Sequence, residues 1–179
     1  QVHGGMGYIE ETGAAQLLRD ARIAAIYEGT NGIQAIDLVT RKLPLAGGAA
    51  VGAHFKELRG IIDAAAASNN PTFGWTAVRL NDALESLAAA TKWLLGLDAK
   101  DADTALAGAT PYLRLFGLAT GGCYLTQQAL AALRLGEDAQ ARVALARFFA
   151  ENIAVSAGAL ERTVVEGGPG LLAADAALS

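Results

Sequence analysis

Apolar residues recur three and four positions apart along most of the chain, which is the spacing of one face of an α-helix. The first two such runs cover residues 12–24 and 31–43, and Gly29 breaks the pattern between them. The stripe predicted for the second run consists of Ile33, Ile36, Val39 and Leu43. These runs predict a pair of helices at the N-terminal end of the chain.

Four longer runs of the same kind predict the main body of the fold. They cover residues 51–67, 72–97, 102–135 and 137–166. Pro111 is expected to split or kink the third, because proline disrupts a helix interior. The spacing in the last run is typical of a helix-bundle seam. That seam consists of Val143, Ala146, Ala150, Ile153, Ala157, Leu160 and Val164.

No strand pattern of comparable strength occurs in the sequence. We therefore predict an all-α fold, in which the N-terminal helical pair is followed by an antiparallel four-helix bundle from about Val51 to Glu166. Thr12 is expected to cap the first helix, and Asn31 with Gln34 has the spacing of a capping box for the second. Residues 167–170 are expected to stop the last long helix and leave a short tail.

An uncharged stretch rich in proline, glycine and alanine begins at Pro44. Such composition ends a helix and is typical of a connection between domains. We therefore divide the chain into residues 1–43, a linker at 44–50, and an additional C-terminal helical domain at 51–179.

Composition and charge exclude some functions. With 53% hydrophobic residues the chain can bury a sizeable core, and its net charge of −4 gives no basic surface for nucleic acid. The single cysteine, Cys123, cannot form an internal disulfide and is expected to be a small buried hydrophobe. This cysteine usage fits a reducing compartment, so we expect a cytoplasmic protein.

One uncharged stretch, Leu115 to Leu133, is long enough to cross a bilayer. It also contains several threonines, glutamines and glycines, so we expect a buried helix of a soluble bundle and no membrane span. The chain begins at Gln1 without a methionine and without the basic and apolar regions of a signal peptide. We expect it to be a piece of a longer protein.

Two short segments carry candidate chemistry. Residues 1–8, Gln-Val-His-Gly-Gly-Met-Gly-Tyr, form a glycine-rich segment whose N–H groups could face a phosphate, although a plain loop has the same spacing. Glu28 precedes the start of a predicted helix, where a solvated carboxylate beside the positive end of the helix dipole is common. Spacing alone leaves both the functional and the structural interpretation open.

Three sequence blocks together are more specific than either segment alone. Residues 1–8, then Leu-Arg-Asp-Ala-Arg at 18–22, then Ile-Tyr-Glu-Gly-Thr-Asn-Gly-Ile-Gln at 26–34, resemble in order and separation the C-terminal end of an acyl-CoA dehydrogenase. The resemblance covers residues 1 to about 43. The alanine-rich remainder is similar to the extra C-terminal helical domain of a bacterial subgroup that includes the methylthiopropanoyl-CoA dehydrogenases.

The resemblance implies a flavoenzyme of fatty acid β-oxidation, which converts an acyl-CoA to the trans-2-enoyl-CoA. It implies that Glu28 removes the α-proton, that Tyr27 walls the substrate pocket and that Gly29 approaches the substrate through its backbone. A carboxylate suits this role, because a weakly acidic α-proton requires a base in a dry site.

The resemblance also implies an FAD site and an oligomer. Thr30, Asn31 and Gly32 match a turn that contacts flavin, although many relatives carry Glu or Gln in place of Gly32. The segment that reaches the FAD of a neighbouring subunit is matched by Gln1, Val2, His3, Gly4 and Gly5. An acceptor of the electron-transfer-flavoprotein type is implied as well. The middle domain that covers the flavin is missing here, so we expect this chain alone to be inactive.

Other interpretations remain open for the rest of the chain. Residues 51–179 could cover the catalytic body or build a subunit interface, or they could dock another protein. The chain could also be a non-catalytic helical scaffold that keeps the family motifs. No metal site is predicted, since His3 and His54 are far apart in sequence without a nearby cysteine. His54 is expected at a core boundary, and Trp75 and Trp93 are expected to pack at helix junctions.

Overall fold

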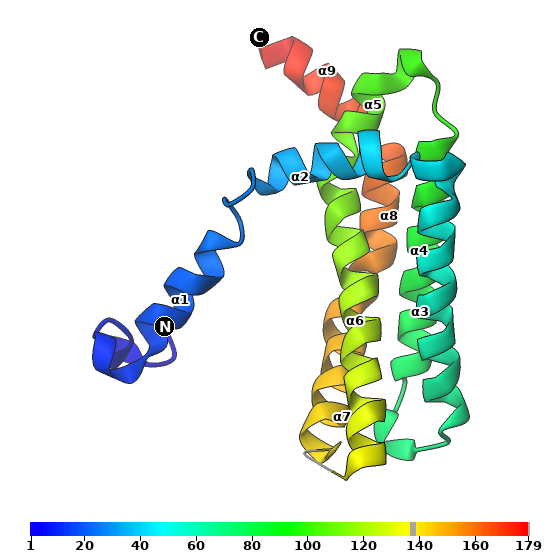
Figure 1. Cartoon of the computed structure of the whole chain (residues 1–179). Coiled ribbons are helices and arrows are strands. Elements are labelled where there is room, and N and C mark those ends of the chain that lie inside the picture. Colours follow the sequence, from blue (N-terminus) through cyan, green and yellow to red (C-terminus); the bar gives the residue numbers. More distant parts are fainter. Residues whose placement is uncertain (137–138, 179) are drawn as a thin grey trace.

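The computed structural model of the protein describes residues 1–136 and 139–178. All regular secondary structure in this part of the chain is helical, which confirms the predicted all-α fold. Figure 1 shows an elongated helical bundle, a helix lying across one end of it, and an N-terminal arm that extends away from the bundle.

The body of the fold is the predicted four-helix bundle. Its members are α3 (Ala49–Ala67), α4 (Thr76–Leu95), α6 (Ala109–Leu135), and the pair α7 (Ala139–Phe148) and α8 (Ala157–Glu166), which together form the fourth long helix. Helix α3 packs on α4 and α6, and α8 packs on the same two helices from the other side. Leucines of α4 supply much of the core, including Leu80, Leu84 and Leu87.

A buried hydrogen bond joins α4 to α6 inside this core. The Tyr112 hydroxyl lies 2.7 Å from Thr91 Oγ1, and the Thr91 hydroxyl is 2.7 Å from the Leu87 carbonyl oxygen. Burial raises the pKa of Tyr112 to about 12, against a smaller opposing effect of the hydrogen bond with Thr91. Both hydroxyls form hydrogen bonds, so burial of these two polar side chains leaves no unsatisfied polar group.

The seam of the fourth helix departs from the prediction at one residue. A π-helical turn at Phe149–Ile153 and a 3-10 turn at Ala154–Ser156 separate α7 from α8. In this irregular segment Ala154 is buried in place of Ile153, whose exposed fraction is 38%. The predicted seam resumes at Ala157, so the change is local. Of the other predicted seam residues, Leu160 is partly buried against the core, and Val143, Ala146, Ala150, Ala157 and Val164 are buried.

The predicted third run is divided into α5 (Ala102–Ala107) and α6 at Gly108. Pro111 lies in the first turn of α6, where the missing N–H costs no hydrogen bond. The predicted tail is also helical: α9 (Gly168–Leu178) follows the stop at Gly167 and packs on α5. Pro169 is at the second position of α9, so the Gly-Pro-Gly sequence ends one helix and begins another.

The first N-terminal helix is shorter than predicted. Helix α1 (Ala14–Ile23) follows 3-10 turns at Gly4–Gly7 and Glu10–Thr12, and none of its residues is buried. Its N-cap is Gly13, in the left-handed conformation. Thr12 does not cap the helix, because its hydroxyl donates to the carbonyl oxygens of Met6, at 2.9 Å, and Ile9.

Helix α2 (Asn31–Asp37), continued by a π-helical turn at Leu38–Lys42, lies across the end of the bundle and packs on α6. Its buried residues are Ala35, Val39 and Leu43. Ile33 and Ile36, predicted on this stripe, are 56% and 41% exposed. The prediction was wrong here because the inward face includes Ala35, whose small side chain hardly marks a hydrophobic pattern.

The predicted linker is a tight turn. After Pro44, a 3-10 turn at Leu45–Gly48 reverses the chain, and Ala46, Gly47 and Gly48 have positive φ. Helix α3 begins at Ala49, directly after this turn. No extended segment therefore separates α2 from the bundle, and the division into domains stays a prediction.

By length and composition alone, one stretch of the described residues, Ala139–Glu166, is apolar enough to cross a membrane. The most apolar 18 residues of this stretch have a mean hydropathy of 1.3 and are 28% buried. Core helices of soluble proteins meet the same criteria, and this stretch packs on α4 and α6. The segment from Leu115 to Leu133 lies in α6, which does not meet them. The expectation that no segment spans a membrane stays a prediction.

The positions of three side chains outside the seams were predicted from the sequence. Trp93 is partly buried against the core, as expected, whereas Trp75 is 62% exposed and that expectation was wrong. Trp75 precedes α4, and its backbone N–H donates to Glu151 at 2.8 Å, so the backbone makes the junction contact. His54 is half-buried, stacked on Phe116 and 3.1 Å from the Thr120 hydroxyl.

We predict that Gly122→Ala destabilises the bundle. A Cβ at Gly122 would collide with the buried Leu80 side chain and lie 3.3 Å from the Phe149 ring. Such overpacking costs about 1–3 kcal/mol. The matched control is Gly117→Ala in the same helix, where a Cβ meets nothing within 4 Å and should stabilise by about 0.5–1 kcal/mol. Urea denaturation of both variants measures the difference, and equal unfolding free energies would contradict the packing.

We also predict that Cys123 is inert until the protein unfolds. The side chain is fully buried, as the sequence predicted, and burial raises its pKa to about 12. The reactive thiolate is therefore both scarce and inaccessible at pH 8. A thiol reagent should label one cysteine per chain in denaturant and none in the native protein. Rapid native labelling would show that α6 does not pack as described.

Candidate functional site

Glu28 lies in the irregular turn between α1 and α2. Its φ is +56°, which is uncommon for a residue with a side chain, and Gly29 follows with a φ of +101°. The Asn31 N–H closes the turn by donating to the Ala25 carbonyl at 3.2 Å. The chain thus bends within a few residues and carries a carboxylate at the bend.

The start of α2 differs from the predicted capping box. Thr30 is the N-cap, with extended backbone angles, and its hydroxyl accepts the Ile33 N–H at 3.4 Å. Gln34 does not reach back to Asn31. Its side-chain Nε2 donates to the Glu28 carbonyl at 2.6 Å, so it contacts the turn that carries the candidate base. The spacing from Thr30 to Gln34 is four positions, one longer than a capping box, so the cap rules do not predict this contact.

The predicted substrate-contacting residues share this surface. Glu28 is exposed, and its carboxylate forms no ion pair with another described residue. Tyr27 and Ile26 beside it are 58% and 62% exposed. At Gly29 an added Cβ would lie 3.2 Å from Ile33 Cγ2, so glycine permits both the positive φ and the contact with Ile33. The result is a carboxylate among apolar side chains on an open surface.

The predicted flavin-contacting residues Thr30, Asn31 and Gly32 form the first turn of α2 and are all exposed. The amides of Asn31 and Ile33 already donate within the turn, to Ala25 and Thr30. The Gly32 N–H has no acceptor among the described residues. Because Gly32 has no side chain, the amide is open to an oxygen atom of a ligand.

The other predicted cofactor-binding residues lie elsewhere. Gln1, Val2, His3, Gly4 and Gly5 run into the exposed turn at Gly4–Gly7, where the Gly4 N–H donates to the Gln1 carbonyl at 3.0 Å. Figure 1 shows this turn at the far end of α1 from Glu28. Within one chain the two predicted parts of the site are therefore not brought together.

An ion-pair cluster lies further along the helix that follows the site. The Arg41 guanidinium donates two hydrogen bonds to Asp37, and Lys42 lies 3.2 Å from the same carboxylate. These contacts, chiefly the hydrogen bond from Arg41, lower the pKa of Asp37 to about 2. Asp37 therefore remains ionised at neutral pH and is not available as an acid or base.

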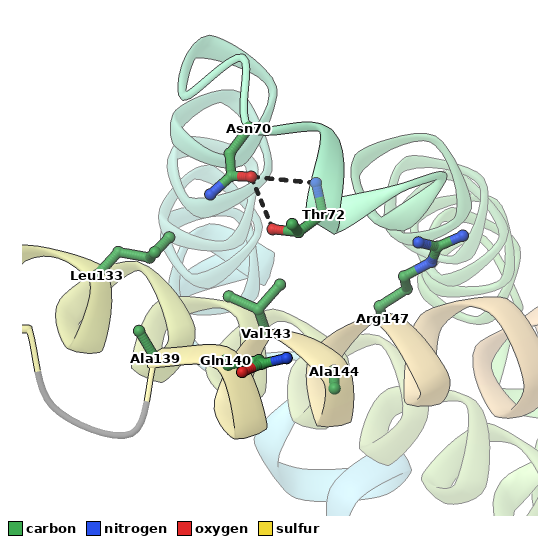
Figure 2. A pocket seen from close by; sticks show the side chains of 8 residues that line it. All are labelled: Asn70, Thr72, Leu133, Ala139, Gln140, Val143, Ala144 and Arg147. Atoms are coloured by element: carbon green, nitrogen blue, oxygen red, sulfur yellow. Dashed lines mark hydrogen bonds between the residues drawn. The ribbon is translucent and has the colours of Figure 1, made fainter.

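A pocket lies far from this site. It has a volume of about 550 Å³ and lies at the opposite end of the bundle, where the α3–α4 connection faces α7. Figure 2 shows Leu133 and Val143 lining it, and Asn70 accepting hydrogen bonds from Thr72. The sequence did not predict this pocket, since its walls come from separate helices. Among the described residues, no group of His, Cys, Asp or Glu side chains could hold a metal ion.

Comparison with known proteins gives the family. Residues 1–43 match the family described as "Acyl-CoA dehydrogenase, C-terminal domain", and residues 54–175 match the family described as "Acetyl-CoA dehydrogenase C-terminal like". The second match alone covers more than half of the chain. The chain belongs to the acyl-CoA dehydrogenase family. This confirms the predicted resemblance in both its N-terminal and its C-terminal part.

Individual relatives agree with this assignment. The chain is 40% identical to "3-methylmercaptopropionyl-CoA dehydrogenase" of Ruegeria pomeroyi over 97% of its own length and 30% of the relative's. It is 31% identical to "Butyryl-CoA dehydrogenase" of Syntrophomonas wolfei, over 86% of this chain and 26% of the relative. It is also 31% identical to a broad-specificity linear acyl-CoA dehydrogenase of Mycobacterium tuberculosis, over 85% of this chain and 27% of the relative. The chain thus spans under a third of the length of these acyl-CoA dehydrogenases.

We predict that Gly29→Ala loosens the turn between α1 and α2. An alanine at a φ of +101° is strained, and its Cβ would press on Ile33. Amide hydrogen exchange should therefore become faster at Asn31, whose N–H closes the turn. The control is Gly13→Ala, which also has positive φ but has open space around the Cβ. Unchanged exchange at Asn31 in Gly29→Ala would be evidence against this turn geometry.

Proposed function

We propose that this chain is the C-terminal part of an FAD-dependent acyl-CoA dehydrogenase, with Glu28 as the base that removes the α-proton of the acyl-CoA thioester. The observation that carries this proposal is the position of Glu28. Its carboxylate is exposed at a bend with positive φ, is unpaired among the described residues, and lies next to Tyr27 and Gly29. The three relatives named above are each described as a dehydrogenase of an acyl-CoA, which supports the reaction class.

The residues of the turn have distinct roles in this proposal. Glu28 accepts the α-proton on a carboxylate oxygen while a C–H bond at the β-carbon also breaks, which leaves the α,β double bond. Tyr27 and Ile26 provide apolar surface beside the carboxylate and exclude water once an acyl chain covers them. Gly29, without a side chain, lets the thioester approach the backbone.

A bound FAD would supply the acceptor for the β-hydrogen and its electron pair. The exposed first turn of α2 fits a contact with this cofactor, because the Gly32 N–H is free among the described residues and no side chain covers it. Thr30 and Asn31 complete the contact surface. The lack of a side chain at Gly32 means that this position contributes its backbone amide only.

The same proposal includes a subunit neighbour. The segment Gln1–Gly5 is exposed and lies at the far end of α1 from Glu28, so it is free to contact the FAD of a second subunit. We therefore propose a cytoplasmic homo-oligomer that oxidises an acyl-CoA and passes electrons to an acceptor of the electron-transfer-flavoprotein type.

Residues 51–179 form, in this proposal, an additional helical domain that covers the catalytic body or a subunit interface. Its buried seams are those of an ordinary helix bundle, and α2 packs directly on it. We further propose that this chain alone neither binds FAD tightly nor turns over acyl-CoA, because Glu28 and the first turn of α2 lie on an open surface. The second candidate, a non-catalytic scaffold, is favoured by no specific observation.

We predict that Glu28→Gln strongly slows substrate-dependent reduction of the flavin in the full-length enzyme. Glutamine keeps the size of the side chain but cannot accept the proton, and loss of a general base costs about 100- to 10,000-fold in rate. Anaerobic addition of short and medium acyl-CoA thioesters, followed by flavin absorbance, measures this step.

The matched control is Glu166→Gln, which removes an exposed carboxylate that forms no ion pair with a described residue. It should bleach the flavin at the wild-type rate. If the wild-type enzyme retains its flavin but no thioester reduces that flavin, the result would support the non-catalytic scaffold instead. Normal bleaching in Glu28→Gln would place the base elsewhere.

A further inference from the structure

The turn that carries Glu28 is held in a conformation that its residues do not prefer. Positive φ at Glu28 is costly for a residue with a Cβ, and the adjacent Gly29 has a φ of +101°. A backbone of this kind persists only where its surroundings fix it. The backbone conformation sets the direction of the Cα–Cβ bond of Glu28, so whatever holds the turn also sets the direction in which the side chain leaves the backbone.

Several contacts hold the turn, and they act at different residues. The Asn31 N–H donates to the Ala25 carbonyl at 3.2 Å, Ile33 Cγ2 lies 3.2 Å from where a Cβ at Gly29 would be, and Gln34 Nε2 donates to the Glu28 carbonyl at 2.6 Å. Only the last one engages Glu28 itself. Gln34 is also the only donor to that carbonyl among the described residues.

Gln34 is well placed to act as an anchor. It is partly buried in the first turns of α2, next to Ala35, whose side chain is fully buried against the bundle. The amide group therefore extends from a helix that is fixed by packing to a backbone carbonyl in an irregular turn. Support from a rigid element restricts a functional side chain more tightly than contacts within a loop.

We propose that Gln34 is a positioning residue for Glu28, which holds the carboxylate in its productive direction through the hydrogen bond to the Glu28 carbonyl. This inference rests on the proposed role of Glu28 as the base. Gln34 contacts neither the α-proton nor the carboxylate oxygens. Its effect on the reaction is through the backbone of Glu28, so it should change the rate of proton removal and leave substrate binding nearly unchanged.

The test uses Gln34→Met in the full-length, flavin-loaded enzyme, because methionine has a similar length but no donor. The control is Gln128→Met, which changes an exposed glutamine of α6 that makes no hydrogen bond to a described residue. We expect kcat for flavin reduction to fall by about tenfold or more in Gln34→Met, as small misplacements of a reacting group do. KM and bound flavin should remain close to the wild-type values.

The double variant Glu28→Gln/Gln34→Met separates positioning from a general structural effect. If Gln34 acts through Glu28, its loss has no further effect on the residual rate of Glu28→Gln, whereas independent effects would multiply. A further multiplicative loss, or loss of bound flavin in both Gln34→Met and the equally sized Gln34→Glu, would overturn the positioning role.

The outcomes distinguish this inference from the proposed function. Normal reduction in the wild type, loss in Glu28→Gln and an unchanged rate in Gln34→Met would overturn the role of Gln34 alone. An enzyme in which Glu28→Gln reacts normally would overturn the role of Glu28 as the base, and the role of Gln34 with it.

Discussion

The packing of α2 on the end of the bundle is the contact on which the rest of the arrangement depends. Ala35, Val39 and Leu43 are buried in the same core as the leucines of α4. The turn at Leu45–Gly48 then leads directly into α3. The turn at Glu28 has little buried surface of its own. Through this contact it is attached to a bundle that has a large buried core. Burial of each of these apolar side chains contributes about 1–3 kcal/mol, less for the alanine.

Much of the fold could be predicted from hydrophobic spacing, and the errors have specific physical causes. The bundle helices and most seam residues follow from the spacing of Val143, Ala146 and Ala150. Between Ala150 and Ala157 the buried residue is Ala154 and not Ile153. Both positions fit helical spacing, and the prediction chose the larger apolar residue. The helical tail α9 was missed because the Gly-Pro-Gly sequence signals a helix start as strongly as a stop.

The candidate site was predicted from its resemblance to a family and not from its spacing. Glu28, Thr30 and Gly29 are informative as a block in sequence, and the comparisons confirm the family to which that block belongs. The contact between Gln34 and the Glu28 carbonyl was not predicted, because it depends on the positive φ of Glu28 and Gly29. Local sequence rules describe regular helix caps, and this turn is not one of them.

The direct connection of α2 to the bundle also determines where the protein can bend. Because residues 31–43 are packed on α6 and the turn after Pro44 is short, the bundle and α2 form one packed unit. The nearest irregular backbone on the N-terminal side is the segment from Ala24 to Thr30. Any reorientation of the bundle relative to α1 would therefore act on the residues around Glu28, so the segment that joins the arm to the bundle also carries the candidate catalytic carboxylate.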